Sequence, residues 1–120
     1  MPIVQINLTK KEDAAVKRNL MDFVADQICK YTSTLPKNIY VYIREWDRDN
    51  VRKTAPTVLI DWTEIPDRTP QAKKEIMLAL TEELVRITGE KREEVVIIFT
   101  DIPLENAMLG GITRSENYNW

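Results

Sequence analysis

Residues 56–62 of this 120-residue chain read Pro-Thr-Val-Leu-Ile-Asp-Trp, and they repeat the pattern Pro-Ile-Val-Gln-Ile-Asn-Leu of residues 2–8. In both segments apolar residues occupy alternate positions, which predicts a strand with one buried face. Residues 39–45 and 95–101 are a second pair of β-rich segments. The sequence therefore predicts a duplicated unit that begins and ends with a strand.

A helical pattern lies between the two strands of each unit. Apolar residues recur at spacings of three and four along residues 16–31 and 76–87, and charged residues occupy the opposite face. This spacing predicts two amphipathic helices, each with one buried face.

The residues at the helix ends support these limits. Thr69 is a favourable N-cap, Pro70 a favourable first helical residue, and Gly89 a favourable residue just past the second helix. For the first helix, Asp13 as N-cap and Thr9 at the start of a capping box are both compatible with the sequence.

The pattern predicts an α/β protein: one domain made of two tandem β-α-β repeats, at about residues 1–54 and 55–120. About 20 residues between two strands are enough for a right-handed crossover helix. Two such units most simply form a four-stranded sheet with both helices on one face. The other face is too apolar to stay exposed to water, so we expect the chain to form oligomers through its sheet. The residues expected on that face include Ile3, Tyr40, Tyr42 and Val96. We expect Trp46, Trp62 and Trp120 at core or subunit contacts.

The composition excludes several classes of function. The chain carries 17 Lys and Arg against 19 Asp and Glu, and this lack of a basic excess argues against nucleic acid as a partner. The absence of His and the single Cys29 exclude an intramolecular disulfide and the common zinc sites, so we expect no metal. No apolar run is long enough to span a membrane, and the N-terminus lacks a signal peptide. We expect a cytoplasmic protein with no membrane partner.

Three further motifs occur in register with the repeat. Met1-Pro2-Ile3-Val4 begins the first strand, residues 67–73 (Asp-Arg-Thr-Pro-Gln-Ala-Lys) begin the second helix, and Glu105-Asn106 leads to Gly110-Gly111 after the last strand. The glycine pair suits a tight turn that returns a terminal strand. Together the three motifs resemble the tautomerase superfamily over nearly the whole chain. The chain is similar to a fused, two-unit version of the 4-oxalocrotonate tautomerase type, whose single unit is half this long. The resemblance implies a homotrimer that mimics a hexamer of single units, with a pocket between units and no cofactor.

The resemblance implies that Pro2 is the catalytic residue. Methionine before a small residue is usually removed in cells, and its removal would leave Pro2 with a secondary amine. An α-amino group titrates at about 8, and burial beside cations lowers its pKa, so this amine can be a neutral base without any histidine. Such a base can move a proton between an enol and its keto form. If Met1 stays on the chain, this chemistry cannot operate. Pro56 cannot be a second base, because its nitrogen lies in a peptide bond.

The superfamily's substrates are small 2-oxo or 2-hydroxy acids, which need a cation for their carboxylate. Arg68 lies where the family's substrate-binding arginine precedes a helix, and its guanidinium can bind the carboxylate there. The family's other arginine, on the second strand of a unit, is replaced by Tyr40 and Val96. Its charge could come from another cation, for which the candidates are Arg44, Arg48 and Arg52. A weaker hydrogen bond from Tyr40 or Tyr42 is the alternative.

Other departures bear on the activity that the resemblance implies. The aromatic residue that closes the family pocket corresponds to Val51 and Ala107, the histidine of the cis-dehalogenase is absent, and the decarboxylase's aspartate corresponds to Ile39. The favoured function is a cofactor-free keto–enol tautomerase (an isomerase) acting on a small carboxylate substrate. The alternatives are a promiscuous hydratase, dehalogenase or decarboxylase with protonated Pro2 as acid, or a non-catalytic trimeric scaffold or small-acid binding protein.

Overall fold

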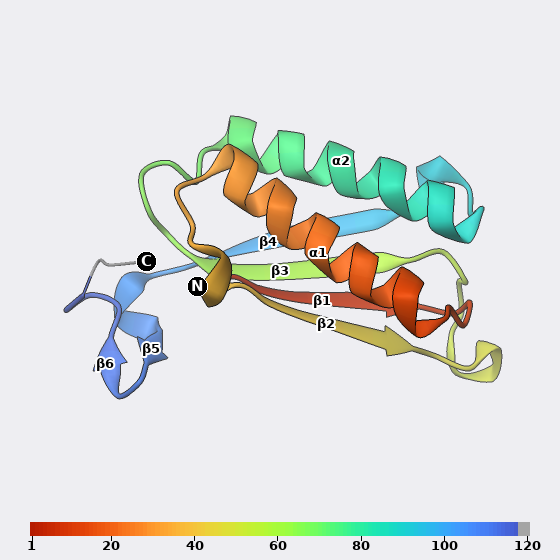
Figure 1. Cartoon of the computed structure of the whole chain (residues 1–120), viewed down its shortest axis with the longest axis horizontal. Helices are drawn as coiled ribbons and strands as arrows, with labels where there is room; N and C mark the ends of the chain where they lie inside the picture. The colour runs from red at the N-terminus through yellow and green to blue at the C-terminus, as the bar shows by residue number, and fades with distance from the viewer. Residues whose placement is uncertain (118–120) are drawn as a thin grey trace.

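Two β-α-β units form one mixed sheet in the computed structural model, which describes residues 1–117. The units consist of β1 (Ile3–Leu8), α1 (Ala14–Tyr31), β2 (Tyr40–Glu45), β3 (Thr57–Thr63), α2 (Pro70–Thr88) and β4 (Val96–Ile102). The strand order is β2-β1-β3-β4; the two central strands are antiparallel, and each outer strand is parallel to its neighbour. Both helices cover the same face of the sheet (Figure 1). The predicted α/β architecture is confirmed.

Short elements follow the same repeat. The 3₁₀ helices η1 (Pro36–Asn38) and η3 (Arg92–Glu94) precede β2 and β4, whereas η2 (Arg48–Asn50) and η4 (Leu104–Asn106) follow them. After η4 the chain forms a hairpin of β5 (Met108–Leu109) and β6 (Ile112–Thr113).

Gly110 and Gly111 form the turn of this hairpin with φ values of 62° and 84°. Two consecutive positive φ values are typical of the tight hairpin turns that favour glycine, so the turn expected here is confirmed. The hairpin lies at the same end of the molecule as the N-terminus (Figure 1).

The helix ends agree with the sequence and decide between the two alternatives for α1. Asp13 is the N-cap of α1: its Oδ1 accepts a hydrogen bond from the Val16 N–H at 3.0 Å. Thr69 caps α2 in the same way, with Oγ1 accepting from the Ala72 N–H at 3.1 Å. Gly89 ends α2 with φ 71°.

The core lies between the sheet and the two helices. Its side chains come from alternate positions of β1 and β3 and from one stripe of each helix, as their periodicity predicts. All of them are 2% exposed or less: Val4, Ile6, Leu8, Leu20, Val24, Ile28, Val58, Ile60, Trp62, Ile76, Leu80 and Leu84.

The tryptophans differ in their surroundings. Trp62 is fully buried and packs on Phe99 with 4.5 Å between ring centroids, so the expected core contact is confirmed for this residue. Trp46 is half-buried after β2, and Trp120 lies outside the described residues.

The sheet face away from the helices is uncovered in the single chain. We call it the open face; its exposed apolar residues are Tyr40 (41%), Tyr42 (57%), Leu59 (40%), Val96 (46%) and Ile98 (49%). A contiguous apolar surface of this kind usually marks a contact with another molecule. No helix within residues 1–117 is long and apolar enough to cross a membrane.

Candidate active site

The candidate active site is at the amino end of β1, in the middle of the sheet. Pro2 is buried there, and its carbonyl accepts a hydrogen bond from the Tyr40 N–H at 3.0 Å. Because β1 and β3 are antiparallel, with Ile3 opposite Asp61, the start of the first repeat lies beside the end of β3. The residues that follow β3 and β4 therefore lie at the same end of the sheet as Pro2.

Arg68 comes from the connection between β3 and α2, and its side chain is only 5% exposed. Its Nη1 donates to the Thr63 carbonyl at 2.6 Å and to Thr63 Oγ1 at 2.9 Å, and its Nη2 donates to Thr34 Oγ1 at 3.0 Å. The guanidinium carbon lies 4.9 Å from the centroid of the Trp62 ring. These contacts hold a buried cation in one orientation, and none of the three acceptor atoms belongs to a charged group.

The hydrogen bond between Arg68 and Thr34 joins the two repeats. Thr34 belongs to the connection between α1 and β2, next to Ser33, whose N–H donates to Asp67 Oδ2 at 2.6 Å. Asp67 and Arg68 are adjacent in the sequence, so neighbouring residues of one connection bind neighbouring residues of the other. The position of the guanidinium therefore depends on both repeats.

Arg114 is a second buried cation near the N-terminus, and sequence reasoning did not single it out. It follows β6, is 3% exposed, and donates its backbone N–H to the Ala107 carbonyl at 2.8 Å. The one signal that pointed towards it was the glycine pair, which predicted a turn that returns the chain. That signal did not say where the returning residues would lie.

The two arginines act on the amino group at the start of the chain. The pKa of the Met1 amine is lowered from 8.0 to about 5; burial is the largest cause, and the positive charges of Arg68 and Arg114 add to it. Both effects disfavour a protonated amine. Burial also lowers the pKa of Arg68 to about 10 and that of Arg114, but an arginine at such a value is still charged at neutral pH.

The other predicted site residues are divided between the two ends of β2. Tyr40 is next to Pro2 through the backbone, and its side chain points to the open face. Arg44 pairs with Asn7 at the far end of β1 and lies over the Trp46 ring at 4.0 Å. Arg48 and Arg52 follow β2 at that same far end. Within one chain, Pro2, Tyr40 and Arg68 come together, whereas Arg44 does not join them.

The two positions that correspond to the family's closing aromatic residue are structurally equivalent. Val51 is the C-cap of η2 and Ala107 that of η4, with φ, ψ of −130°, 147° and −130°, 141°. Neither side chain has the ring of the family residue. Among residues 1–117, no three His, Cys, Asp or Glu side chains are grouped so that they could hold a metal ion.

The sequence profile of the family described as "Tautomerase enzyme" matches residues 56–115, which is the second repeat. The chain belongs to the tautomerase family. No curated protein gives a significant match to its sequence.

Several solved structures share its fold over nearly the whole chain. The structure of Pt0534 inactivated by 2-oxo-3-pentynoate is 21% identical, with a TM-score of 0.80 and coverage of 96% of this chain and 98% of that one. The wild-type asymmetric trimer of F6 fused 4-OT is 16% identical, with a TM-score of 0.82 and coverage of 95% and 97%. A native fused 4-OT is 17% identical, with a TM-score of 0.80 and coverage of 98% and 99%. This tautomerase-family chain is thus of the fused, two-unit type.

Proposed function

We propose that this fused tautomerase is a cofactor-free keto–enol tautomerase of small 2-oxo acids, with the amine of Pro2 as general base after removal of Met1. The observation that carries the proposal is the pair of buried arginines at the amino end of β1. They favour a neutral amine, and their charge suits an anionic substrate.

The lowered pKa favours a base over an acid in this position. The burial and positive charges that lower the pKa of the Met1 amine would act in the same direction on an amine at Pro2, and a neutral amine can accept a proton. Removal of Met1 moves the amino group to Pro2, which is itself buried. The hydratase and decarboxylase alternatives need a protonated amine, which this surrounding disfavours.

The proton movement needs no other reagent. In the enol-to-keto direction, the neutral amine removes the proton of the 2-hydroxyl group, and the C–O bond becomes a carbonyl. The electron pair of the C2–C3 double bond then takes a proton from the resulting ammonium at C3, which restores the neutral amine. The arginines stabilise the substrate carboxylate and the negative charge that develops on the C2 oxygen.

Arg68 and Arg114 differ in how they are held, which suggests a division of roles. The Arg68 guanidinium is oriented by two threonines, so it suits directional binding of a carboxylate. Arg114 follows the short hairpin beyond η4, and its positive charge also acts on the amino group at the start of the chain.

The decisive experiment compares two prolines at equivalent positions of the repeats. On protein shown by intact mass to lack Met1, Pro2→Ala should lower turnover of the phenylpyruvate enol by about 10²-fold or more, the scale of a general base. Pro56→Ala is the matched control, because the Pro56 nitrogen is already an amide; its turnover should stay within a few-fold of wild type.

Two results would contradict the proposal. Unchanged turnover in a folded Pro2→Ala variant would move the activity away from this amine. Wild-type protein that lacks Met1 and still fails to tautomerise any 2-oxo acid would favour the binding or scaffold alternative.

We further propose that three chains assemble through their open faces. Fused 4-OT of the same fold has been solved as a trimer, and the open face of this chain carries five exposed apolar side chains. In such an assembly a residue like Arg44 reaches a Pro2 site only from a neighbouring subunit, which is how a cation could replace the family arginine missing at Tyr40 and Val96.

A further inference from the structure

The carboxylate of Asp101 joins three elements at the same end of the sheet as Pro2. Its Oδ1 accepts a hydrogen bond from Trp62 Nε1 at 2.8 Å, and its Oδ2 accepts one from Lys73 Nζ at 2.5 Å. Asp101 lies on β4 opposite Trp62 of β3, and Lys73 lies near the start of α2. Asp101 therefore contacts both elements between which the connection with Arg68 runs.

The Trp62 ring links this carboxylate to the guanidinium of Arg68. The ring is fully buried, and the guanidinium carbon lies over it, 4.9 Å from its centroid. A cation in this position is attracted to the face of the indole. A buried indole N–H also needs an acceptor, so the bond to Asp101 fixes the orientation of the ring on which Arg68 lies.

The surroundings of Asp101 keep it ionised. Burial opposes its negative charge, but hydrogen bonds from Lys73 and Trp62, together with the charges of Lys73 and Arg68, outweigh burial and lower its pKa. An ionised carboxylate accepts stronger hydrogen bonds than a neutral group does. The bond that orients the Trp62 ring is therefore a charge-assisted one.

The first repeat has an equivalent ion pair but no guanidinium beside it. Lys17 Nζ donates to Glu45 Oε1 at 3.0 Å, and Glu45 is the counterpart of Asp101, 56 positions earlier. The second oxygen of Glu45 accepts from the backbone N–H of Glu12 at 2.6 Å, and Glu12 is the counterpart of Arg68 at the same offset. In each repeat the carboxylate thus supports the same position before the helix, directly in the first and through the Trp62 ring in the second.

We propose that Asp101 is a positioning residue, which holds the Trp62 ring and through it orients the guanidinium of Arg68 towards the substrate carboxylate. The inference rests on the proposed function, in which Arg68 binds that carboxylate. Asp101 acts through Trp62 and Arg68 and not on the substrate itself.

The kinetic test compares two substitutions of Asp101 in protein that lacks Met1. Asp101→Ala removes the acceptor of the Trp62 N–H and should raise KM for the phenylpyruvate enol about 10-fold, with kcat within a few-fold. Asp101→Asn keeps an acceptor oxygen without the charge, and its KM should stay within about three-fold of wild type. If Asp101→Ala does not fold, Asp101→Leu removes the same acceptor and fills more of its space.

Two further comparisons show whether the effect passes through Arg68. On an ester of the substrate, most of the KM effect of Asp101→Ala should disappear. In an Arg68→Ala background, adding Asp101→Ala should change KM less than about two-fold, because the group that it orients is already absent.

The matched control is Glu45→Ala, which removes the equivalent carboxylate at the other end of the sheet. It loses the ion pair with Lys17 and the hydrogen bond from the Glu12 N–H. Its KM should stay within about two-fold of wild type, because neither group lies beside Arg68.

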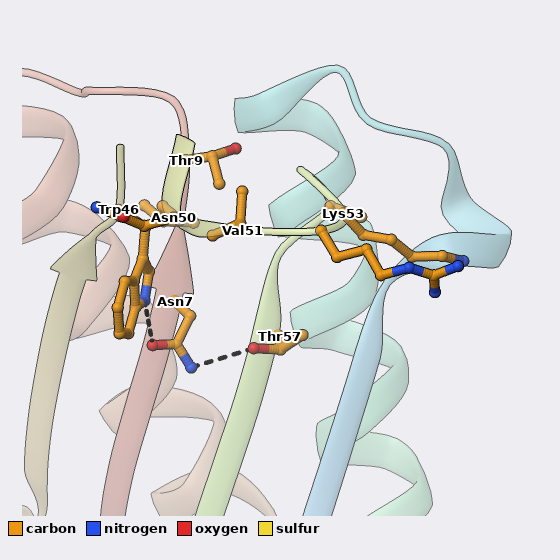
Figure 2. Close-up of a pocket in the computed structure, with 10 residues that line it drawn as sticks. Asn7, Thr9, Trp46, Asn50, Val51, Lys53 and Thr57 are labelled. Atoms are coloured by element: carbon orange, nitrogen blue, oxygen red, sulfur yellow. Dashed lines mark hydrogen bonds between the residues drawn. The ribbon is translucent and has the colours of Figure 1, made fainter. Parts of the chain in front are cut away.

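Side-chain signals of the ¹⁵N-labelled protein test the positions without any turnover. The Trp62 indole N–H and the Arg68 Nε–H, assigned by their loss in Trp62→Phe and Arg68→Lys, should both shift more in Asp101→Ala than in Asp101→Asn. The Trp46 indole is the internal comparison, since it donates to Asn7 Oδ1 at 2.9 Å at the far end of the sheet (Figure 2). Its signal should stay in place in both variants.

Four outcomes would overturn the proposal. They are an unmoved Arg68 signal in folded Asp101→Ala, an equal rise of KM in Asp101→Asn, an equal rise in Glu45→Ala, and a full additional rise in the Arg68→Ala background. Wild-type protein that lacks Met1 and does not turn over the enol would contradict the proposed function instead. The Trp62 and Arg68 signals would then still decide whether Asp101 positions the guanidinium.

Discussion

Arg68 and Arg114 bring two positive charges to the amino end of β1, where an isolated α-amino group would otherwise be protonated at neutral pH. Burial of the amine is the larger effect on its pKa, and the two arginines add to it. The side chains proposed to bind an anionic substrate would thus also keep the proposed base in its neutral form. The roles of Arg68 and Arg114 can be distinguished by experiment. A change in substrate binding alters KM, whereas a change in the pKa of the amine shifts the pH profile of kcat/KM.

The first prediction concerns the pH dependence set by Arg114. In the proposed mechanism the neutral amine is the base, so kcat/KM should fall as the pH drops through the pKa of the amine. Loss of a nearby cation raises that pKa, and Arg114→Gln should therefore move the acid limb of the kcat/KM profile to higher pH. Arg114→Lys keeps the charge and should leave the limb close to its wild-type position.

The matched control for this prediction is Arg18→Gln, which removes an exposed positive charge from α1. Its profile should coincide with that of the wild type. An unmoved acid limb in a folded Arg114→Gln variant would remove Arg114 from the electrostatics of the amine.

The second prediction concerns substrate binding by Arg68. Arg68→Ala should lower kcat/KM about 10- to 150-fold, the worth of a charge-assisted bidentate contact, mainly through a higher KM. Arg68→Lys should recover only part of the loss, because an ammonium cannot bond to Thr63 and Thr34 as the fork does. If Arg68 also polarises the carbonyl group of the substrate, kcat of Arg68→Ala should fall as well.

An ester analogue of the substrate distinguishes this role from a structural one. Without a carboxylate, most of the penalty for Arg68→Ala should disappear. Equal penalties on the acid and the ester would mean that the variant damages the connection between β3 and α2 instead.

At the scale of the elements, the two helices have N-caps of the same geometry but different neighbours. Asp13 caps α1 at the end of the sheet away from Pro2, whereas Thr69 caps α2 directly after Arg68. The cap of α2 therefore supports both the helix and the position of a buried guanidinium, whereas the cap of α1 supports the helix alone.

The third prediction uses this pair of caps. Thr69→Ala and Asp13→Ala should each lower the free energy of unfolding by about 1 kcal/mol, measured by urea denaturation. Thr69→Ala should also raise KM several-fold, because the backbone of Arg68 loses its support. Asp13→Ala should leave KM unchanged at an equal loss of stability; a parallel rise in both variants would show that KM merely follows stability.

Local signals predicted the elements, and contacts between elements decided what those signals left open. Periodicity, Thr69 and Gly89 placed both helices correctly. The choice between Thr9 and Asp13 depended on tertiary contacts: Thr9 Oγ1 donates to Thr54, and the Glu12 N–H donates to Glu45 Oε2 at 2.6 Å, so neither group serves a capping box. No pattern confined to residues 9–16 contains that information.

The same distinction applies to the candidate site. The repeat and the family motifs indicated Pro2 and Arg68, and the antiparallel pairing of β1 with β3 accounts for their proximity. Arg44 lies far from Pro2 because β2 runs parallel to β1, with Arg44 opposite Asn7, and this separation already follows from the crossover that the repeat predicts. Arg114 was missed because a hairpin carries it back to Pro2, and the two glycines predict the turn without its direction.

On the scale of the whole molecule, the single chain leaves half of its sheet surface without a cover. The helices bury one face, and the open face keeps Tyr42, Val96 and Ile98 between 46% and 57% exposed. Burial of apolar surface stabilises an assembly by roughly 25 cal/mol per Å², so association through this face is favourable. The proposed trimer accounts for the open face and gives Pro2 neighbours from other subunits.

The last prediction tests assembly and shared pocket together. Ile98 is 49% exposed on β4 and pairs with Leu59 across the open face, so Ile98→Glu places a charge where the proposed contact excludes water. An unpaired charge buried in an interface costs several kcal/mol, and the trimer should dissociate. Leu78→Glu is the control, because Leu78 is similarly exposed (43%) but lies on α2, away from the sheet face.

Sedimentation velocity at micromolar concentration should give trimers for the wild type and Leu78→Glu and monomers for Ile98→Glu. Turnover should fall with dissociation, because subunits that no longer meet cannot complete each other's pockets. A wild-type monomer would contradict the assembly, and a monomeric Ile98→Glu variant with full turnover would show that one chain contains the whole site.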